Sequence, residues 1–488
     1  MISVDSALKA LEIGDVSRPG NDCSKLPHTS SPSCMTEVTG EVTEMDSLKL
    51  GAKIIEEGEV SSPVHKYVAS SLAAAARDPI ERLAGIRREF GEHGGVNASV
   101  EASTTFTVLA AKTIPDIFEG KTEGCFLYGR HFNPTVVALS RQLAAIEGTE
   151  SAYCTASGMS AIACALLGLL DTGDHLVATD TLYAATWALL AEFLPQKCGI
   201  TCTFVNVQDP EAVAEAMIEG KTKVLYVETI SNPTLRLSNI PMLAQIAHGM
   251  GAKMVVDNTF APLVVTPADH GADVVVHSLT KFINGGSDYI AGCVCGTNKF
   301  INSLMDLHTG PLMLLGPTMD PHVAHAISLR IPHLPLRMAE HARRAQLLAE
   351  RLSELGINVS YPGLKEHPDH ALLLAIGRKE FGGGGVITID CGSKLKAEEL
   401  MDELQNKHGF GYVAVSLGYF DTLMSCSASS TSSEMDEFSR TQSGIGQGLV
   451  RMSVGFTGSR DQRWRQLRCA LQSVGLTTAE SAQRGEGI

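Results

Sequence analysis

Between residues 150 and 300, short continuous apolar runs alternate with helical segments, and this alternation restricts the fold more than any other feature of the chain. The apolar runs cover residues 175–179, 224–227, 254–256 and 274–276, and helical patterns at 210–218 and 240–249 lie between them. Strands that are apolar throughout are typical of a parallel sheet with both faces buried. The sequence therefore predicts an α/β fold with a mainly parallel sheet covered by helices.

Polar residues stand at or just beyond the ends of three of these runs. They are Glu228, Asp257 and Ser278. Ligands of open parallel sheets bind beyond the carboxyl ends of the strands. We therefore expect the functional site at this edge of the sheet.

The domain organisation follows from changes in pattern along the 488 residues, of which 44% are hydrophobic. Residues 1–84 are predicted to form a partly disordered extension that leads into an arm, and residues 85–335 a large α/β domain. A long helix from 336 to 355 opens a smaller α+β domain at 336–475, and 476–488 are predicted to be a flexible tail. A turn of four glycines at 382–385 precedes a strand at 386–389, which favours a loop over a phosphate-binding site.

Several classes of protein are disfavoured by composition. The net charge of −15 argues against nucleic acid as a partner, and no apolar run approaches the roughly 20 residues that span a bilayer. The twelve cysteines are scattered, without a Cys-x-x-Cys pair, so we expect reduced thiols, no metal site and a cytoplasmic protein. The acidic N-terminus is not typical of a signal or transit peptide. Dinucleotide, P-loop and zinc-protease motifs are not found.

Lys281 follows the run at 274–276, within the sequence His277-Ser-Leu-Thr-Lys281. A lysine beside a buried strand is poorly suited to the core, but its amine can form a Schiff base with an aldehyde cofactor. Taken alone, such a Ser-x-Thr-Lys sequence is more typical of a surface lysine. The residues around the other strand ends are needed to decide between the two interpretations.

Asp257 and Tyr183 are candidates for contacts to the ring of such a cofactor. A carboxylate at a buried strand end requires a cation or strong donors, and the pyridinium N–H of pyridoxal phosphate (PLP) is such a partner. The alternative for Asp257 is a helix cap, and for Tyr183 a packed surface ring. Residues 155–162 precede an apolar helix that Ser157 or Ser160 can cap, and a helix N-terminus there would bind a phosphate. Ser278 and Thr280 add hydroxyl donors.

Five motifs carry a resemblance to the PLP enzymes of cysteine and methionine metabolism, the cystathionine lyase and synthase family. They read FGEHGGVN at 90–97, YGRHFNPT at 128–135, YCTASGMS at 153–160, VAVSLGY at 413–419 and RMSVG at 451–455. The resemblance covers roughly residues 85–475 and is greatest to the plant-type methionine gamma-lyases of this family. It implies an aminotransferase-like PLP fold.

The resemblance also implies roles for individual residues. Lys281 would hold PLP as a Schiff base and then move protons, with Asp257 on the ring nitrogen and Tyr183 stacked on the ring. The cofactor phosphate would be bound by Gly158, Met159, Ser278 and Thr280, and from a neighbouring subunit by Tyr128 and Arg130. Arg451, Ser416 and Asn232 would bind the substrate carboxylate. A homo-oligomer, usually a tetramer, is implied.

The expected reaction is α,γ-elimination of L-methionine to methanethiol, 2-oxobutanoate and ammonia. Cleavage of cystathionine or homocysteine, γ-replacement on an activated homoserine, and a non-catalytic PLP-binding role remain as alternatives. Two departures from related sequences bear on the choice. Ala185 stands where bacterial methionine gamma-lyases have a cysteine, and residues 281–288 read KFINGGSD where many relatives have Lys-Tyr and Gly-His-Ser-Asp.

Overall fold

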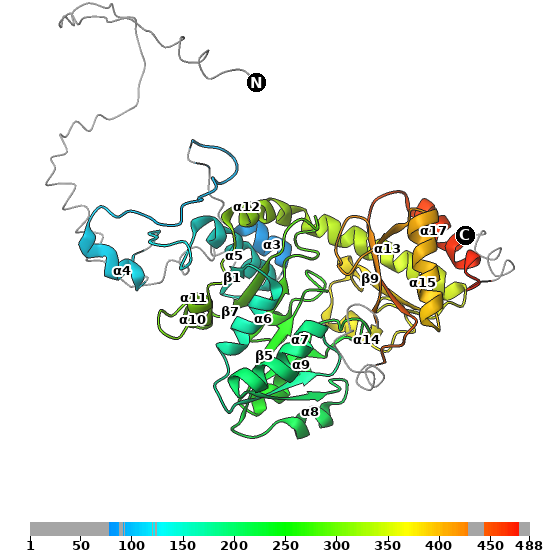
Figure 1. Cartoon of the computed structure of the whole chain (residues 1–488), viewed down its shortest axis with the longest axis horizontal. Coiled ribbons are helices and arrows are strands. Elements are labelled where there is room, and N and C mark those ends of the chain that lie inside the picture. The colour runs from blue at the N-terminus through cyan, green and yellow to red at the C-terminus, as the bar shows by residue number, and fades with distance from the viewer. Residues whose placement is uncertain are drawn as a thin grey trace, which may run out of the picture. The chain divides into compact units, whose positions relative to one another are not determined.

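The computed structural model describes residues 78–86, 91, 93–119, 121–122, 124–427 and 444–477. Within them, a seven-stranded sheet and a five-stranded sheet organise a larger and a smaller α/β region (Figure 1). Most of the predicted extension at 1–84 and most of the predicted tail at 476–488 lie outside the described residues. None of the helices in this part of the chain combines the length and the apolar character that crossing a membrane requires.

The large sheet has the strand order β1-β7-β6-β5-β4-β2-β3. The strands β2 to β6 run parallel to one another, whereas β7 is antiparallel to both β6 and β1. The predicted mainly parallel sheet is therefore confirmed. The strands are β1 Ser151–Thr155, β2 His175–Thr179, β3 Thr201–Val205, β4 Thr222–Glu228, β5 Lys253–Asp257, β6 Val274–Ser278 and β7 Gly292–Gly296.

Two apolar cores cover the two faces of this sheet. Side chains alternate along each strand, so that Val256 and Val275 enter one core while Val255 and Val276 enter the other. Helices α5, α9 and α12 supply the first core, and α6, α10, α11 and the π-helical segment η4 the second. Burying each aliphatic side chain contributes about 1.5–3 kcal/mol, which explains why these strands are apolar throughout.

The helices of the large region begin with α3 Pro79–Gly85, which packs on α5 through buried Leu83, so the predicted boundary at residue 84 falls inside this helix. The others are α4 Ile114–Phe118, α5 Pro134–Glu147, α6 Gly158–Leu167, α7 Ala184–Ala188, η4 Leu189–Cys198, α8 Pro210–Ala216, α9 Ile240–Gly249, α10 Asn298–Leu304, α11 Pro311–Leu315 and α12 Pro321–Arg330, with short 3₁₀ segments at Ala111–Thr113, Pro267–His270 and Ile331–His333.

The smaller sheet has the strand order β10-β11-β12-β9-β8. Its strands are β8 Val359–Ser360, β9 Val386–Asp390, β10 Gly411–Val413, β11 Thr422–Cys426 and β12 Leu449–Ser453. The helices are α13 Leu334–Glu354, α14 His370–Ile376, α15 Lys394–Asp402 and α17 Arg460–Ser473, with short segments at Lys379–Phe381 and Glu403–Lys407. The long helix α13 starts two residues before the predicted position because Pro335 occupies its first turn. The glycines at 382–385 form the loop before β9, as predicted.

Candidate active site

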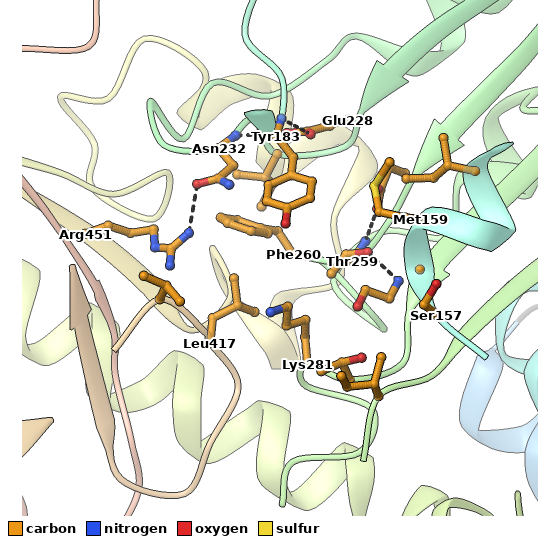
Figure 2. A pocket seen from close by; sticks show the side chains of 18 residues that line it. Ser157, Met159, Tyr183, Glu228, Asn232, Thr259, Phe260, Lys281, Leu417 and Arg451 are labelled. Carbon is orange, nitrogen blue, oxygen red and sulfur yellow. Dashed lines mark hydrogen bonds between the residues drawn. The ribbon is translucent and has the colours of Figure 1, made fainter. Parts of the chain in front are cut away.

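One cavity of about 260 Å³ lies where the carboxyl ends of β4, β5 and β6 face the smaller sheet region. Residues from both regions line it, and Figure 2 shows the Lys281 amine and the Tyr183 ring approaching it from opposite sides. Nine of the twelve residues predicted for the site line this cavity: Asn232, Asp257, Gly158, Met159, Ser278, Thr280, Tyr183, Lys281 and Arg451.

Lys281 lies in the turn that follows β6, three residues beyond the end of the strand. Its Nζ donates a hydrogen bond to Ser416 Oγ at 3.1 Å, which brings Ser416 to the same place. Burial, together with the positive charge of Arg451, lowers the pKa of Lys281 to about 8. A lysine with this pKa carries a substantial fraction of neutral, nucleophilic amine near neutral pH.

Two acidic side chains end neighbouring strands and face the cavity. Asp257 on β5 is paired in register with Glu228 on β4. Burial raises the pKa of Glu228 to about 8, and the charge of Asp257 contributes to this shift. Burial also raises the pKa of Asp257. Two buried carboxyl groups repel each other when both are ionised, so a cation bound beside them would be stabilised.

Asp257 also accepts a local hydrogen bond from the backbone, as an aspartate that caps a helix would. Its Oδ1 accepts from the amide of Thr259 at 2.9 Å, while the Tyr226 hydroxyl donates to Oδ2 at 3.4 Å. The backbone after Asp257 forms turns and not a helix, so Asp257 does not cap one. Its carboxylate remains available to a donor in the cavity, because a carboxylate accepts about four hydrogen bonds.

The N-terminus of α6 opens onto the same cavity. Ser157, one of the two predicted caps, caps this ten-residue helix and forms a capping box with Ser160. A Cβ atom on Gly158 would lie 2.7 Å from the Cβ of Ser278, so only glycine allows the helix to approach β6 this closely. Within the described residues, the amides of Gly158 and Met159 have no hydrogen-bond partner. Free amides at a helix N-terminus can bind an anion such as a phosphate.

Tyr183 is the residue before α7, and 41% of it is exposed. Its backbone amide donates to Glu228 Oε1 at 2.8 Å, and the amide of Asn232 donates to Oε2 at 3.0 Å. The buried Glu228 carboxyl group therefore connects the segment that carries the Tyr183 ring with the loop that carries Asn232. The exposed ring can cover a flat molecule in the cavity.

A buried guanidinium enters the cavity from the smaller sheet. Arg451 on β12 donates to Asn232 Oδ1 at 3.0 Å and to the backbone oxygen of Ser416 at 3.2 Å. Burial lowers the pKa of Arg451 to about 10. Because Asn232 and Ser416 are neutral, the positive charge of Arg451 is left for an anion, such as the carboxylate of an amino acid.

Tyr128 and Arg130 do not line this cavity. The Arg130 guanidinium lies 5.6 Å from the centroid of the Tyr128 ring and donates to the backbone oxygen of Met313 at 2.7 Å. Tyr128 is 46% exposed. Their predicted role from a neighbouring subunit stays a prediction.

Several cavity residues were not assigned a function from the sequence. They are Ser157, Ile162, Glu228, Ile230, Thr259, Phe260, Ile290, Val415 and Leu417. Glu228 was expected only at a strand end, and its position directly after the apolar run 224–227 was the available indication. The apolar residues gave no such indication, because an isolated Ile or Leu is far more often part of a core. In the described part of the chain, no group of three His, Cys, Asp or Glu side chains could hold a metal ion.

An amine of lowered pKa, a strand-end carboxylate, an anion-binding helix N-terminus and an aromatic ring in one cavity match the aldehyde, ring nitrogen, phosphate and ring of PLP. The fold and this set of groups are those of PLP enzymes that hold the cofactor through a lysine. The family model of Cys/Met metabolism PLP-dependent enzymes matches residues 83–462. The chain belongs to this family and is a PLP-dependent carbon–sulfur lyase.

Individual relatives support a more specific comparison. The chain is 54% identical over 404 residues to a methionine gamma-lyase of Arabidopsis thaliana, a match that covers 82% of this chain and 92% of that relative. It is 35% identical to an L-methionine gamma-lyase of Treponema denticola, over 76% of this chain and 91% of the relative. A solved cystathionine gamma synthase from Xanthomonas oryzae pv. oryzae, in complex with cystathionine, superimposes with a TM-score of 0.72 at 30% identity and covers 84% of this chain and 100% of its own.

The lowered pKa of Lys281 gives a prediction for cofactor capture. Only the neutral amine attacks an aldehyde, so the rate at which cofactor-free protein forms the covalent link should rise with pH and level off above about pH 8. A free lysine side chain, whose pKa is near 10.4, should keep accelerating to about pH 10. Stopped-flow absorbance with PLP, and with Nα-acetyl-lysine as the control, measures both profiles. A protein profile that follows the free amine would contradict the shift.

Proposed function

We propose that this chain catalyses the α,γ-elimination of L-methionine to methanethiol, 2-oxobutanoate and ammonia. The observation that carries the proposal is the arrangement of Lys281 and Arg451 in one cavity whose remaining wall is mostly apolar. The two charged groups suit the reacting end of an amino acid. The apolar wall suits an uncharged thioether. The similarity to methionine gamma-lyases over most of the chain agrees with this choice.

Each charged residue has a defined task in this proposal. PLP, when bound, supplies an electrophilic carbon for the substrate amine and a ring that delocalises negative charge. Arg451 binds the substrate carboxylate, with Asn232 and Ser416 orienting the guanidinium. The Lys281 amine, once free of the cofactor, accepts the Cα proton as a general base, and Ser416 Oγ holds that amine in position. A second deprotonation, at Cβ, then supplies the electron pair that lets the thiolate leave from Cγ.

The remaining proposed contacts hold the cofactor. Asp257 faces the ring nitrogen, and the Tyr183 ring covers the ring face, while the Tyr183 hydroxyl can protonate the departing thiolate. The phosphate is held by the amides of Gly158 and Met159 and the hydroxyls of Ser278 and Thr280. In the structure, the Thr280 hydroxyl donates its one proton to the backbone oxygen of Ala291 at 3.2 Å and accepts from the Ala291 amide at 3.0 Å. It would donate to the phosphate by giving up its bond to the Ala291 oxygen.

Methionine is favoured over cystathionine because of the side chains that line the cavity. Cystathionine carries a second ammonium and a second carboxylate, and both would need partners. The lining includes the apolar side chains of Ile290, Val415 and Leu417, and its strongly ionic side chains are the four already assigned: Glu228, Asp257, Lys281 and Arg451. Lining residues that leave no free charge disfavour a substrate with a charged far end.

The specificity is tested by comparing kcat/KM for L-methionine, L-cystathionine, L-homocysteine and O-acyl-homoserines with the PLP-loaded protein. We expect L-methionine to give the highest value among the elimination substrates, with methanethiol and 2-oxobutanoate formed in equal amounts. Preference for cystathionine or homocysteine would reassign the substrate. Faster γ-replacement on an O-acyl-homoserine would reassign the reaction, and no turnover would support a non-catalytic role.

We also propose a homo-oligomer in which Tyr128 and Arg130 reach the phosphate of a neighbouring subunit, as in a tetramer built of such dimers. Both residues lie away from their own cavity, and exposed Leu314 and Leu315 follow Met313, the residue that Arg130 contacts. Mixing Arg130→Ala and Lys281→Ala chains tests sharing of sites. Co-refolded mixtures should regain up to about a quarter of the activity, because half of the dimers are mixed and each has one intact site. Inactive mixed dimers would contradict the proposal.

A cytoplasmic location is our proposal for the compartment. No two of the ten cysteines in the described residues are joined by a disulfide, and Cys154, Cys164, Cys293 and Cys295 are buried. Such thiols are typical of a reducing compartment. Imaging of a C-terminal fluorescent fusion, which leaves any N-terminal targeting segment free, would show an organellar pattern if the proposal is wrong.

A further inference from the structure

A buried hydrogen-bond network lies on the opposite face of the large sheet from the cavity. At its centre is Glu147, the last residue of α5, whose side chain is 1% exposed. Because a carboxylate only accepts, His277 Nε2 donates to its Oε1, at 2.8 Å. Asn258 Nδ2 donates to the two oxygens at 3.1 and 3.3 Å, and the Thr229 hydroxyl donates to Asn258 Oδ1 at 2.8 Å.

Every member of the network apart from Glu147 is the chain neighbour of a residue that lines the cavity. His277 precedes Ser278, Asn258 follows Asp257, and Thr229 follows Glu228. Consecutive residues at the end of a strand point to opposite faces of the sheet. The cavity residues therefore face the cofactor side, while their neighbours converge on Glu147 from the ends of β4, β5 and β6.

Stability alone does not account for a carboxylate at this position. Glu147 ends α5, whose buried Leu143 and Ala144 belong to the same apolar core as Ala152 of β1, and α5 contacts both β1 and β7. A buried charged group costs free energy to desolvate, and replacing such groups by packed apolar residues is often neutral or stabilising. What an apolar residue cannot do is fix three separate strand ends through directed hydrogen bonds.

We propose that Glu147 is a positioning residue for the PLP site, which fixes the relative positions of Ser278, Asp257 and Glu228 through His277, Asn258 and Thr229. The inference rests on the cofactor site proposed above. Ser278 faces the phosphate and Asp257 the ring nitrogen, so a shift of one strand end relative to another changes how both ends of the cofactor are held. Glu147 itself touches neither cofactor nor substrate.

The experiment compares cofactor binding by Glu147→Gln, Thr229→Val and the wild-type protein. Glutamine keeps the size of the side chain but presents an NH₂ group to the Asn258 or His277 donors. Thr229→Val removes only the outermost hydrogen bond. We expect the dissociation constant for PLP to rise by about tenfold in Glu147→Gln and by about two- to fivefold in Thr229→Val. The visible circular dichroism of bound PLP, which reports how rigidly the ring is held, should weaken in the same order.

His175 supplies a matched control for loss of a buried polar contact. It is 2% exposed and begins β2 of the same sheet, and its ring bonds at 2.8 Å to Oγ1 of Thr222, the first residue of β4, and at 2.9 Å to Oγ1 of Thr203, in the middle of β3. His175→Gln should lower the unfolding temperature without changing PLP affinity or circular dichroism.

Failure of the positioning role and failure of the cofactor site give different results in this experiment. If Glu147→Gln and Thr229→Val alter stability but leave PLP affinity and circular dichroism at the His175→Gln values, the positioning role is wrong. Should Glu147→Gln fail to fold, Thr229→Val alone decides by the same criterion. A wild-type protein that binds no PLP would instead overturn the cofactor site, whatever the variants do.

Discussion

Lys281→Ala is expected to abolish the covalent link to PLP and to lower kcat by about 10²–10⁴-fold or more. In the proposed mechanism, Lys281 provides both the amine that holds the cofactor and the base that accepts the Cα proton, and Arg451, the other cation of the cavity, is too weak an acid to replace a neutral base. Borohydride reduction of the wild-type holoenzyme, followed by peptide mass spectrometry, should place the pyridoxyl group on Lys281. The variant should bind PLP without incorporating it.

Lys223→Ala is the matched control, because Lys223 is a half-buried lysine on β4 whose Nζ donates only to the backbone oxygen of Gly220 among its described contacts. It should retain wild-type absorbance and turnover. Added methylamine should restore part of the proton transfer in Lys281→Ala, since the deleted group is then replaced by a diffusible amine. Pyridoxyl found on another lysine, or turnover within tenfold of wild type, would remove Lys281 from its proposed role.

The strand ends of the site could be predicted from the sequence because they depend on local pattern. Apolar runs located β4, β5 and β6, and the carboxyl ends of parallel strands meet at one edge, so Glu228, Asp257 and Ser278 could be expected to lie together. Strand β3 was not predicted. It lies at the edge of the sheet and is partly exposed, so its sequence TCTFV mixes polar and apolar residues.

Contacts between distant segments could not be obtained in this way. Arg451 meets Asn232 across 219 residues of sequence, and His277 meets Glu147 across 130. No periodicity of the sequence relates such positions. Arg451 was therefore assigned to the site only through a resemblance to a known family, and Glu147 was not predicted to have any role. Glu147 is the last residue of α5 and precedes Gly148, which has a left-handed conformation. A residue followed by such a glycine is typical of an ordinary helix end, so the sequence gives no sign of a further role.

Asp257→Asn is expected to lower kcat/KM for L-methionine by about 10²–10³-fold, the loss that follows removal of one partner from a buried charge pair. An asparagine keeps the shape and can still accept from Thr259, but it carries no charge to keep the ring nitrogen protonated. Exchange of the methionine Cα proton with deuterium, followed by NMR, isolates the affected step. Its rate should fall with kcat/KM, while PLP remains covalently bound.

Asp257→Asn should also lower the pKa of the Glu228 carboxyl, because the charge of Asp257 helps to hold that pKa at about 8. Without that charge, Glu228 would ionise at lower pH, but both its oxygens already accept amides of the chain, so it would not replace Asp257 at the ring nitrogen. Asp180→Asn is the matched control: Asp180 follows β2 directly, and burial raises the pKa of this carboxyl too, but it does not line the cavity. If Asp180→Asn slows Cα exchange as much as Asp257→Asn, the effect is general loss of a buried carboxylate. If only Asp257→Asn slows Cα exchange, the effect belongs to the carboxylate at the end of β5, as the proposed contact to the ring nitrogen requires.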